Sequence, residues 1–235
     1  MKNVGFLQVL LVISFLSAPA FSESPDSFSK AKRIASRLFQ ENPITLYCLC
    51  AYDAKGEIDL DSCGMSEAQS KKRAHRLEWE HLFAVEHFGK QFPCWRENLC
   101  TDSKGKPYHG RQCCEKVDAE FRHLEAELFN LWPAVGLVNQ ARSNYRYGMV
   151  AEKKPFYGCA IGIDKANRRA EPPDYAKGIV ARASLFLADF YHLSLSDSQR
   201  QLFLAWHRQF PPSDWERHWA SDIARIEGYS NPYIS

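Results

Sequence analysis

The sequence predicts an α+β fold. We expect a mostly helical single domain that contains a small β-sheet and is stabilised by disulfide bonds. Several segments carry apolar residues at helical spacing, while residues 44–51 and 159–163 have the composition of short strands. Eight cysteines, an even number, follow an N-terminus that resembles an export leader. With 235 residues, the chain is long enough for one well-packed core and too short for two large ones.

The N-terminus has the organisation of a secretory signal peptide. Lys2 supplies the positive charge, an apolar run covers residues 4–16, and small residues follow it up to Ser22. The apolar run is too short to cross a bilayer comfortably. We therefore expect a signal peptide over residues 1–22 and a mature domain over residues 23–235, with no membrane-spanning segment.

The first half of the mature chain is predicted to begin with an amphipathic helix over residues 27–40, because its apolar residues recur at helical spacing. Residues 44–51 are β-branched and aromatic, which predicts a strand. The polar, basic residues 66–76 fit either a helix or an extended arm, and residues 81–88 fit either a strand end or a helix. Residues 89–112 form a long loop that we expect the cysteines to hold in place.

The second half is predicted to be mainly helical, with one helix over residues 116–129. Pro133 suits the first turn of a new helix that runs to about Asn144, because its missing N–H has no partner there in any case. A long apolar stripe predicts a helix over residues 175–191. A capping box predicts the start of another helix, over residues 196–209. The acidic N-cap Asp214 and a C-terminal glycine predict the last helix, over residues 214–228.

The eight cysteines are best explained by disulfides. Their spacing lacks the paired knuckles of a structural zinc site, since Cys113 and Cys114 are adjacent and only one residue separates Cys48 from Cys50. The connectivity cannot be deduced from the sequence. Two candidate pairs are Cys50–Cys63 and Cys48–Cys159.

The net charge of +2 does not by itself indicate a nucleic-acid partner. The distribution of charge is more informative, because cations gather at residues 71–76, at Arg142 and Arg146, and at residues 165–169. Taken alone, each of these clusters is more commonly solvated surface charge than a binding site.

A carboxylate and an imidazole stand side by side in Glu80-His81. Neighbouring side chains of an extended segment point to opposite faces, so both serve one site only if the backbone bends there or each has a separate task. A hard cation can use the carboxylate, and a water can use the imidazole as its proton acceptor. This pair indicates metal-assisted phosphodiester cleavage, with Glu80 on the metal and His81 as the base.

A second polar set lies at Asn139, Arg142 and Asn144. Asn139 and Arg142 are three residues apart and would share one face of a helix, where an amide oxygen suits a metal and a guanidinium suits a phosphate. Spacing alone favours the simpler interpretation, in which both are ordinary surface residues.

Several motifs in order resemble the bacterial endonuclease I family over about residues 27–234. The first four motifs are Arg76-Leu-Glu-Trp-Glu-His81, Phe88-Gly89, Cys94-Trp95 and Asn130-Leu-x-Pro-Ala-Val-Gly-x-Val-Asn139-x-x-Arg-Ser-Asn144. The later ones are Glu171-Pro-Pro, Lys177-Gly-Ile-Val-Ala-Arg182, Ile223-Ala-Arg-Ile-x-Gly228 and Asn231-Pro-Tyr233. Linked motifs are far more specific than any one of them.

The resemblance implies a periplasmic or secreted nuclease with a ββα-metal (His-Me finger) site that cuts DNA, and often RNA, with little sequence preference. It assigns His81 as general base and Glu80 and Asn139 as ligands of one divalent ion, usually Mg²⁺ and otherwise Mn²⁺ or Ca²⁺. Glu125 matches a carboxylate near the water shell of the metal. Arg96 stands nearest to the family's phosphate-binding arginine.

The expected partner is therefore nucleic acid, held through its phosphates, with Arg76, Arg142 and Asn144 as further contacts and the protein a monomer. The family usually has Val-Val-Pro after the Glu-His pair, whereas this chain has Leu82-Phe83-Ala84. Two alternatives stay open at this point. One is a metal-independent secreted ribonuclease, and the other is a binding module of the same fold that has lost catalysis.

Overall fold

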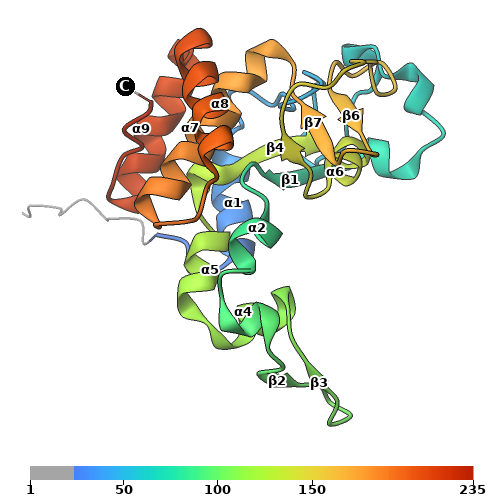
Figure 1. Cartoon of the computed structure of the whole chain (residues 1–235). Coiled ribbons are helices and arrows are strands. Elements are labelled where there is room, and N and C mark those ends of the chain that lie inside the picture. Colours follow the sequence, from blue (N-terminus) through green and yellow to red (C-terminus); the bar gives the residue numbers. More distant parts are fainter. Residues whose placement is uncertain (1–23, 235) are drawn as a thin grey trace, which may run out of the picture.

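The computed structural model describes residues 24–234, so the predicted signal peptide lies outside the described residues. The structure mixes helices with small sheets, as predicted (Figure 1). The helices are α1 (Phe28–Leu38), α2 (Val85–Gly89), α3 (Pro93–Arg96), α4 (Arg111–Val117), α5 (Ala119–Glu125), α6 (Gly136–Arg142), α7 (Asp174–Phe190), α8 (Asp197–Gln209) and α9 (Asp214–Glu227). The strands are β1 (Leu77–His81), β2 (Cys100–Thr101), β3 (Pro107–Tyr108), β4 (Leu131–Val135), β5 (Arg146–Tyr147), β6 (Gly162–Asp164) and β7 (Arg169–Glu171).

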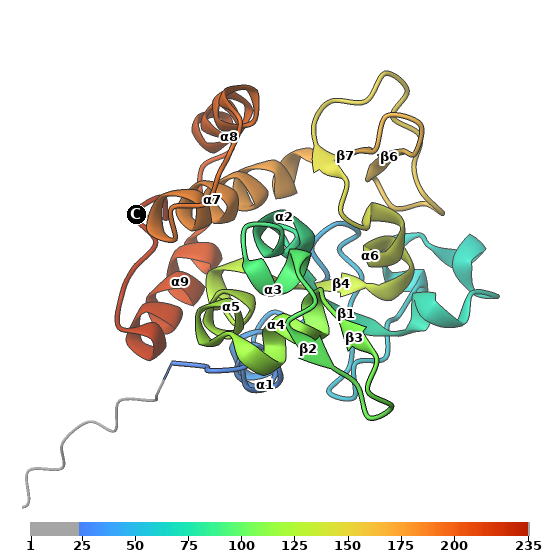
Figure 2. The same cartoon turned by 60° about the horizontal axis from the view of Figure 1, so that its bottom comes forward.

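Strands β1 and β4 form an antiparallel pair at the centre of the molecule, with Leu77 opposite Val135 and His81 opposite Leu131. Helix α6 begins directly after β4 and lies beside the pair (Figures 1 and 2). Two strands and one helix, drawn from segments about fifty residues apart in the sequence, therefore meet in one unit. This unit positions the candidate site.

Helices α7, α8 and α9 gather at one end of the molecule, and the β5–β7–β6 sheet lies toward the other (Figure 1). An aromatic cluster joins the helical end to the central pair, since the Trp132 ring of β4 lies 4.8 Å from that of Trp219 and 5.2 Å from that of Phe39. Both tryptophans are buried core residues. Among the described residues, no helix is both long and apolar enough to span a membrane.

All four disulfides are formed, and no described cysteine is free. The two candidate pairs, Cys48–Cys159 and Cys50–Cys63, are confirmed. The other two, Cys94–Cys114 and Cys100–Cys113, hold the long loop as expected. This loop carries α3 and the β2–β3 hairpin, which projects from the body (Figure 1).

Residues 44–51 do not form the predicted strand. Only an isolated bridge joins Ile44 to Ala51, and the backbone between them closes on itself, with the Thr45 N–H donating to the Cys50 carbonyl at 2.9 Å. Leu49 adopts a left-handed φ of 58°, which a strand does not allow. Local hydrogen bonds and the two disulfides at Cys48 and Cys50 outweigh the β propensity here. Basic residues 66–76 form short 3₁₀ turns, Ser66–Ala68 and Lys72–His75.

The single helix predicted over residues 116–129 is two helices, α4 and α5. Asp118 separates them, because its backbone is extended and its carboxylate accepts from the Phe121 N–H at 2.9 Å, which caps α5. The helices predicted near residues 27–40, 175–191, 196–209 and 214–228 are confirmed.

Pro133 lies in the middle of β4, so the prediction that it opens a helix is wrong. Its carbonyl accepts from the Leu46 N–H at 2.8 Å, on the side of β4 that faces away from β1. The missing N–H of proline faces that same side, and the β1–β4 ladder therefore loses no hydrogen bond. The helix begins only at Gly136, which places Asn139 in its first turn.

Candidate active site

A cavity of about 680 Å³ opens along β1 and the first turns of α6. Glu80 and His81 at the end of β1 line it, together with Asn139, Arg142 and Asn144. The structure thus brings five of the sequence-predicted site residues to one cavity, from two segments that the sequence separates widely.

Glu80 is buried, with 2% of its surface exposed, and is held at one oxygen. Oε1 accepts from the Tyr47 hydroxyl at 2.9 Å and lies 3.1 Å from Nη1 of Arg142. Burial raises the pKa of Glu80, while Arg142 and the Tyr47 hydroxyl oppose that rise. Among the described residues nothing donates a hydrogen bond to Oε2, so one carboxylate oxygen keeps its capacity to bind.

Arg142, predicted to contact substrate, is itself 2% exposed. Nη1 donates to the His81 carbonyl at 3.0 Å and Nη2 to the Leu82 carbonyl at 2.6 Å. Its guanidinium also lies 4.4 Å from the centre of the Tyr147 ring. In this arrangement Arg142 holds Glu80 and the end of β1 in place, which is a positioning role.

His81 is oriented by a single hydrogen bond. Nε2 lies 2.8 Å from the backbone carbonyl of Glu125, and because a carbonyl can only accept, Nε2 carries the proton. Burial, followed by the charge of Arg111, lowers the pKa of His81 to about 3, so the ring is neutral at pH 7. Nδ1 of the neutral ring then has a free lone pair, as a proton acceptor requires.

Asn130, fully buried, fixes the turn that follows His81. Its side-chain oxygen accepts from the Phe83 N–H at 2.7 Å, and its Nδ2 donates to the Phe83 carbonyl at 3.1 Å. Its own carbonyl accepts from the Leu82 N–H at 3.0 Å. Three hydrogen bonds therefore rigidify the turn in which this chain has Leu82-Phe83-Ala84 in place of a proline-containing segment.

Asn139 is hydrogen-bonded to β1, because its Nδ2 donates to Oε2 of Glu78 at 3.2 Å. Glu78 and Glu80 are two apart on the strand and point to the same face, so the amide lies on the face that carries Glu80. Gly136 permits this close approach, because a Cβ there would meet the Arg73 carbonyl oxygen at 2.7 Å and Glu78 Oε1 at 2.9 Å. Arg73 in turn pairs with both oxygens of Glu78 at 2.8 Å.

The residues present fit a hard divalent cation. Glu80 Oε2 and the Asn139 side-chain oxygen accept no hydrogen bond from the described residues, and both side chains line the same cavity. Magnesium prefers such oxygen ligands and keeps several of its waters. No cluster of three or more His, Cys, Asp or Glu suited to a metal occurs within residues 24–234, so such an ion would depend on these two oxygens and water.

Arg111 also lines this cavity, and the sequence did not single it out. It lies 5.3 Å from the Phe28 ring, which packs 4.7 Å from the His81 ring, and its Nε pairs with Glu125 Oε1 at 2.5 Å. Burial raises the pKa of the Glu125 carboxyl to about 7 despite the neighbouring Arg111. The adjacent Cys113 and Cys114 anchor Arg111, and this position beside the cysteine pair is the signal that could have revealed it.

Three predicted residues do not line the cavity. The Glu125 carboxylate is linked to it only through its ion pair with Arg111. Arg96 ends α3 on the exposed surface and does not line the cavity, so the structure does not bring it to His81. Arg76 is also exposed, pairs with Glu78 at 3.1 Å, and faces a different hollow of the surface. The sequence motif placed both arginines close to the site along the chain, but their side chains point outward.

Comparison with known proteins agrees with the motifs. The family model described as Endonuclease I matches residues 22–235. An extracellular deoxyribonuclease of Aeromonas hydrophila is 35% identical, over 96% of this chain and 95% of the relative. A periplasmic deoxyribonuclease of the same species is 36% identical, over 93% and 90%. Endonuclease-1 of Buchnera aphidicola subsp. Baizongia pistaciae is 34% identical, over 99% and 94%.

The names of these relatives bear out the expected periplasmic or extracellular location, and the four disulfides are typical of such oxidising compartments. The family match likewise bears out the prediction of a nuclease enzyme. On this match, which spans residues 22–235 and therefore every residue of the cavity, the chain belongs to the endonuclease I family.

Proposed function

We propose that this nuclease is a divalent-metal-dependent endonuclease that hydrolyses phosphodiester bonds of DNA, and also of RNA, with little sequence preference. One observation carries the proposal. The Glu125 carbonyl fixes the proton of His81 on Nε2, which leaves Nδ1 open in the cavity that the free oxygens of Glu80 and Asn139 also line.

In the proposed reaction His81 accepts the proton of the attacking water at Nδ1. Arg111 binds the phosphate, because its guanidinium lines the cavity and is paired with Glu125 at one nitrogen only. Glu80 and Asn139 would hold the ion, Mg²⁺ or another divalent cation. When bound, such an ion neutralises phosphate charge and stabilises the leaving oxygen.

Substrate contacts are proposed to be mainly to phosphate, which carries no sequence information. Lys32 and Arg111 place two cations at the rim of the cavity, and Asn144 adds an amide. Arg76 and Arg96 are exposed and could contact a long duplex only outside the cleavage cavity, since neither residue lines it. We also propose that the protein acts as a monomer.

The test is plasmid nicking by purified His81→Ala, which should lower the rate by about 10²–10⁴-fold. His123→Ala is the matched control, because His123 is exposed and does not line the cavity. EDTA should abolish parent activity, and added Mg²⁺ should restore it. Full activity in EDTA on RNA alone would favour a metal-independent ribonuclease, and binding without cleavage would favour an inactive binding module.

A further inference from the structure

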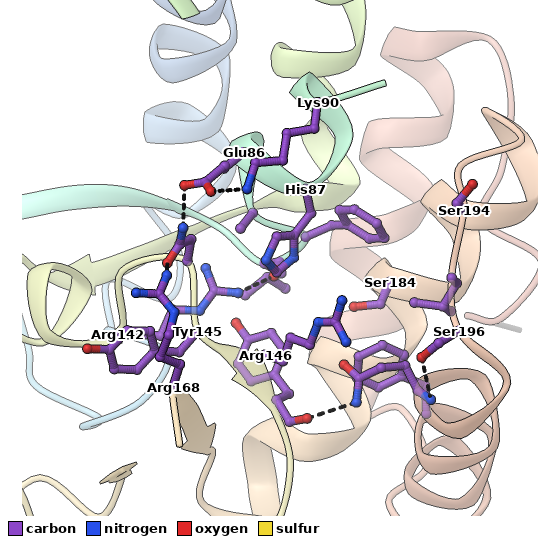
Figure 3. Close-up of a pocket in the computed structure, with 18 of the residues that line it drawn as sticks. Glu86, His87, Lys90, Arg142, Tyr145, Arg146, Arg168, Ser184, Ser194 and Ser196 are labelled. Carbon is purple, nitrogen blue, oxygen red and sulfur yellow. Dashed lines mark hydrogen bonds and ion pairs between the residues drawn. The ribbon is translucent and has the colours of Figure 1, made fainter. Parts of the chain in front are cut away.

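A second pocket of about 470 Å³ opens next to the catalytic cavity (Figure 3). The two hollows share the side chains of Ala84, Glu86, Arg142 and Asn144, so they are neighbours on the surface. Asn144 lines both, donating from Nδ2 to Glu86 and accepting from Arg168 Nη2 at 2.6 Å. A strand that extends beyond the catalytic cavity on this side would meet this pocket next.

Four cations line the pocket, and carboxylates pair with only two of them. Lys90 pairs with Glu86, and Arg142 pairs with Glu80. Arg146 and Arg168 have no carboxylate partner among the described residues, and the Arg146 side chain points into the pocket, toward Ser184 (Figure 3). Two exposed guanidiniums are therefore free to bind an anion.

The rest of the lining is suited to a nucleoside. Leu195 and Phe203 supply apolar surface. Ser194 and Ser196 lie on the side of the pocket opposite Arg168 (Figure 3), where the Ser196 hydroxyl accepts from the Gln199 N–H and caps α8. The guanidinium of Arg168 also lies 5.2 Å from the centre of the Tyr145 ring, a cation–π contact. Ligand pockets of this size, with a few polar groups on an apolar lining, hold small organic molecules.

We propose that this pocket is a nucleotide subsite, which binds the nucleotide next to the scissile phosphodiester of a strand lying in the catalytic cavity. Arg168 and Arg146 lie at two separate places in the pocket (Figure 3) and contact successive phosphates of the strand, and the apolar wall of Leu195 and Phe203 receives a sugar and base. This inference rests on the proposed endonuclease function and adds the place where the strand continues beyond the cleaved bond.

The test compares Arg146→Ala, Arg168→Ala and the double variant with Lys165→Ala. Lys165 is the matched control, because it is an exposed cation close to Arg168 in sequence that does not line the pocket. Fluorescence anisotropy of a labelled single-stranded 12-mer in EDTA measures binding without cleavage. Each arginine variant should bind about tenfold more weakly, and the slope of log affinity against log salt should fall by about one for each phosphate that the variant no longer binds.

Steady-state cleavage of long DNA supplies the second readout. The double variant should raise KM while kcat stays within about twofold, because binding energy outside the reacting centre is lost. If the parent cleaves DNA but the arginine variants bind the 12-mer as the Lys165→Ala control does, the subsite is overturned and the endonuclease proposal stands. If the parent fails to cleave while the arginine variants still lose affinity, the endonuclease proposal fails and the pocket remains a strand-binding site.

Discussion

The molecule contains two buried arginine–glutamate pairs that differ in how completely they are satisfied. Arg182 of α7 binds Glu216 of α9 through Nε at 2.7 Å and Nη2 at 2.5 Å, and its Nη1 donates to the Phe210 carbonyl at 2.7 Å. Both carboxylate oxygens of Glu216 are engaged. Arg142 meets only Oε1 of Glu80, and its own Nε is buried without a partner.

The difference separates a structural pair from a pair that serves a site. The Arg182–Glu216 pair forms a closed fork that joins helices and leaves no binding capacity. The Arg142–Glu80 pair leaves Oε2 of Glu80 free on the side of the cavity, at the cost of an unsatisfied nitrogen on Arg142. A buried charge pair that is incompletely paired, and that borders a cavity, therefore marks the place where a ligand is expected.

The largest effect is expected from breaking the structural pair. Arg182→Ala leaves Glu216 buried and without its cation, which should lower the free energy of unfolding by about 3–5 kcal/mol. Chemical denaturation measures this loss, and the kcat of the folded fraction should remain within about twofold of the parent.

The matched control for Arg182→Ala replaces both partners with apolar residues of similar size, Arg182→Met with Glu216→Leu. That double variant should recover most of the lost stability, because neither charge is left uncompensated. A single Arg182→Ala variant as stable as the parent would contradict the structural role given to this pair.

Breaking the site pair should affect function as well as stability. Arg142→Ala removes the group that positions Glu80, and it should raise the Mg²⁺ concentration needed for half-maximal activity by about 10–100-fold. The double change Arg142→Met with Glu80→Leu should recover stability but no activity, which distinguishes it from the corresponding double change at Arg182. An Arg142→Ala variant with the parent's Mg²⁺ requirement would remove the distinction between the two pairs.

The three C-terminal helices could be predicted from the sequence because their signals are local. Helix α8 begins at its capping box. Helix α9 begins where predicted, but its cap is the Ser213 hydroxyl, which accepts from the Glu216 N–H at 3.1 Å, and not the predicted carboxylate of Asp214. Their apolar stripes are long enough to outweigh individual residues. Asp118 ends one helix and caps the next, between α4 and α5. Apolar periodicity does not register such a single residue, so it predicted one helix there.

The site was predictable only in part, because its geometry depends on contacts between distant segments. The motif indicated Glu80, His81 and Asn139, but their meeting requires the β1–β4 pairing, which the helical interpretation of Pro133 missed. Arg111 reaches the cavity through α4, which two disulfides of undeducible connectivity anchor. The place of Arg111 beside Cys113 and Cys114 is visible in the sequence, but the disulfide pairing that brings it to the cavity is not.

A smaller effect should come from Glu227, a buried carboxyl that lacks even an incomplete ion pair. Its Oε1 is buried without a partner, and burial, together with the nearby Glu127 carboxyl, raises the pKa of Glu227 to about 7. An unfolded glutamate titrates near pH 4.5. The folded state therefore holds this proton more tightly, so the group stabilises the fold below about pH 4.5, and that stability is lost as the pH rises to about 7.

Glu227→Gln keeps the shape of the side chain and removes the titration. Relative to the parent, the variant should gain about 1–3 kcal/mol of unfolding free energy between pH 5 and pH 8, since only the parent must ionise a buried carboxyl in that interval. Glu41→Gln, at an exposed position, is the control and should show no such gain. Denaturation curves at both pH values measure the difference. An equal gain in both variants would mean that burial without a cation does not destabilise ionised Glu227. The comparison of paired and unpaired buried charges would then hold only for the two arginine–glutamate pairs.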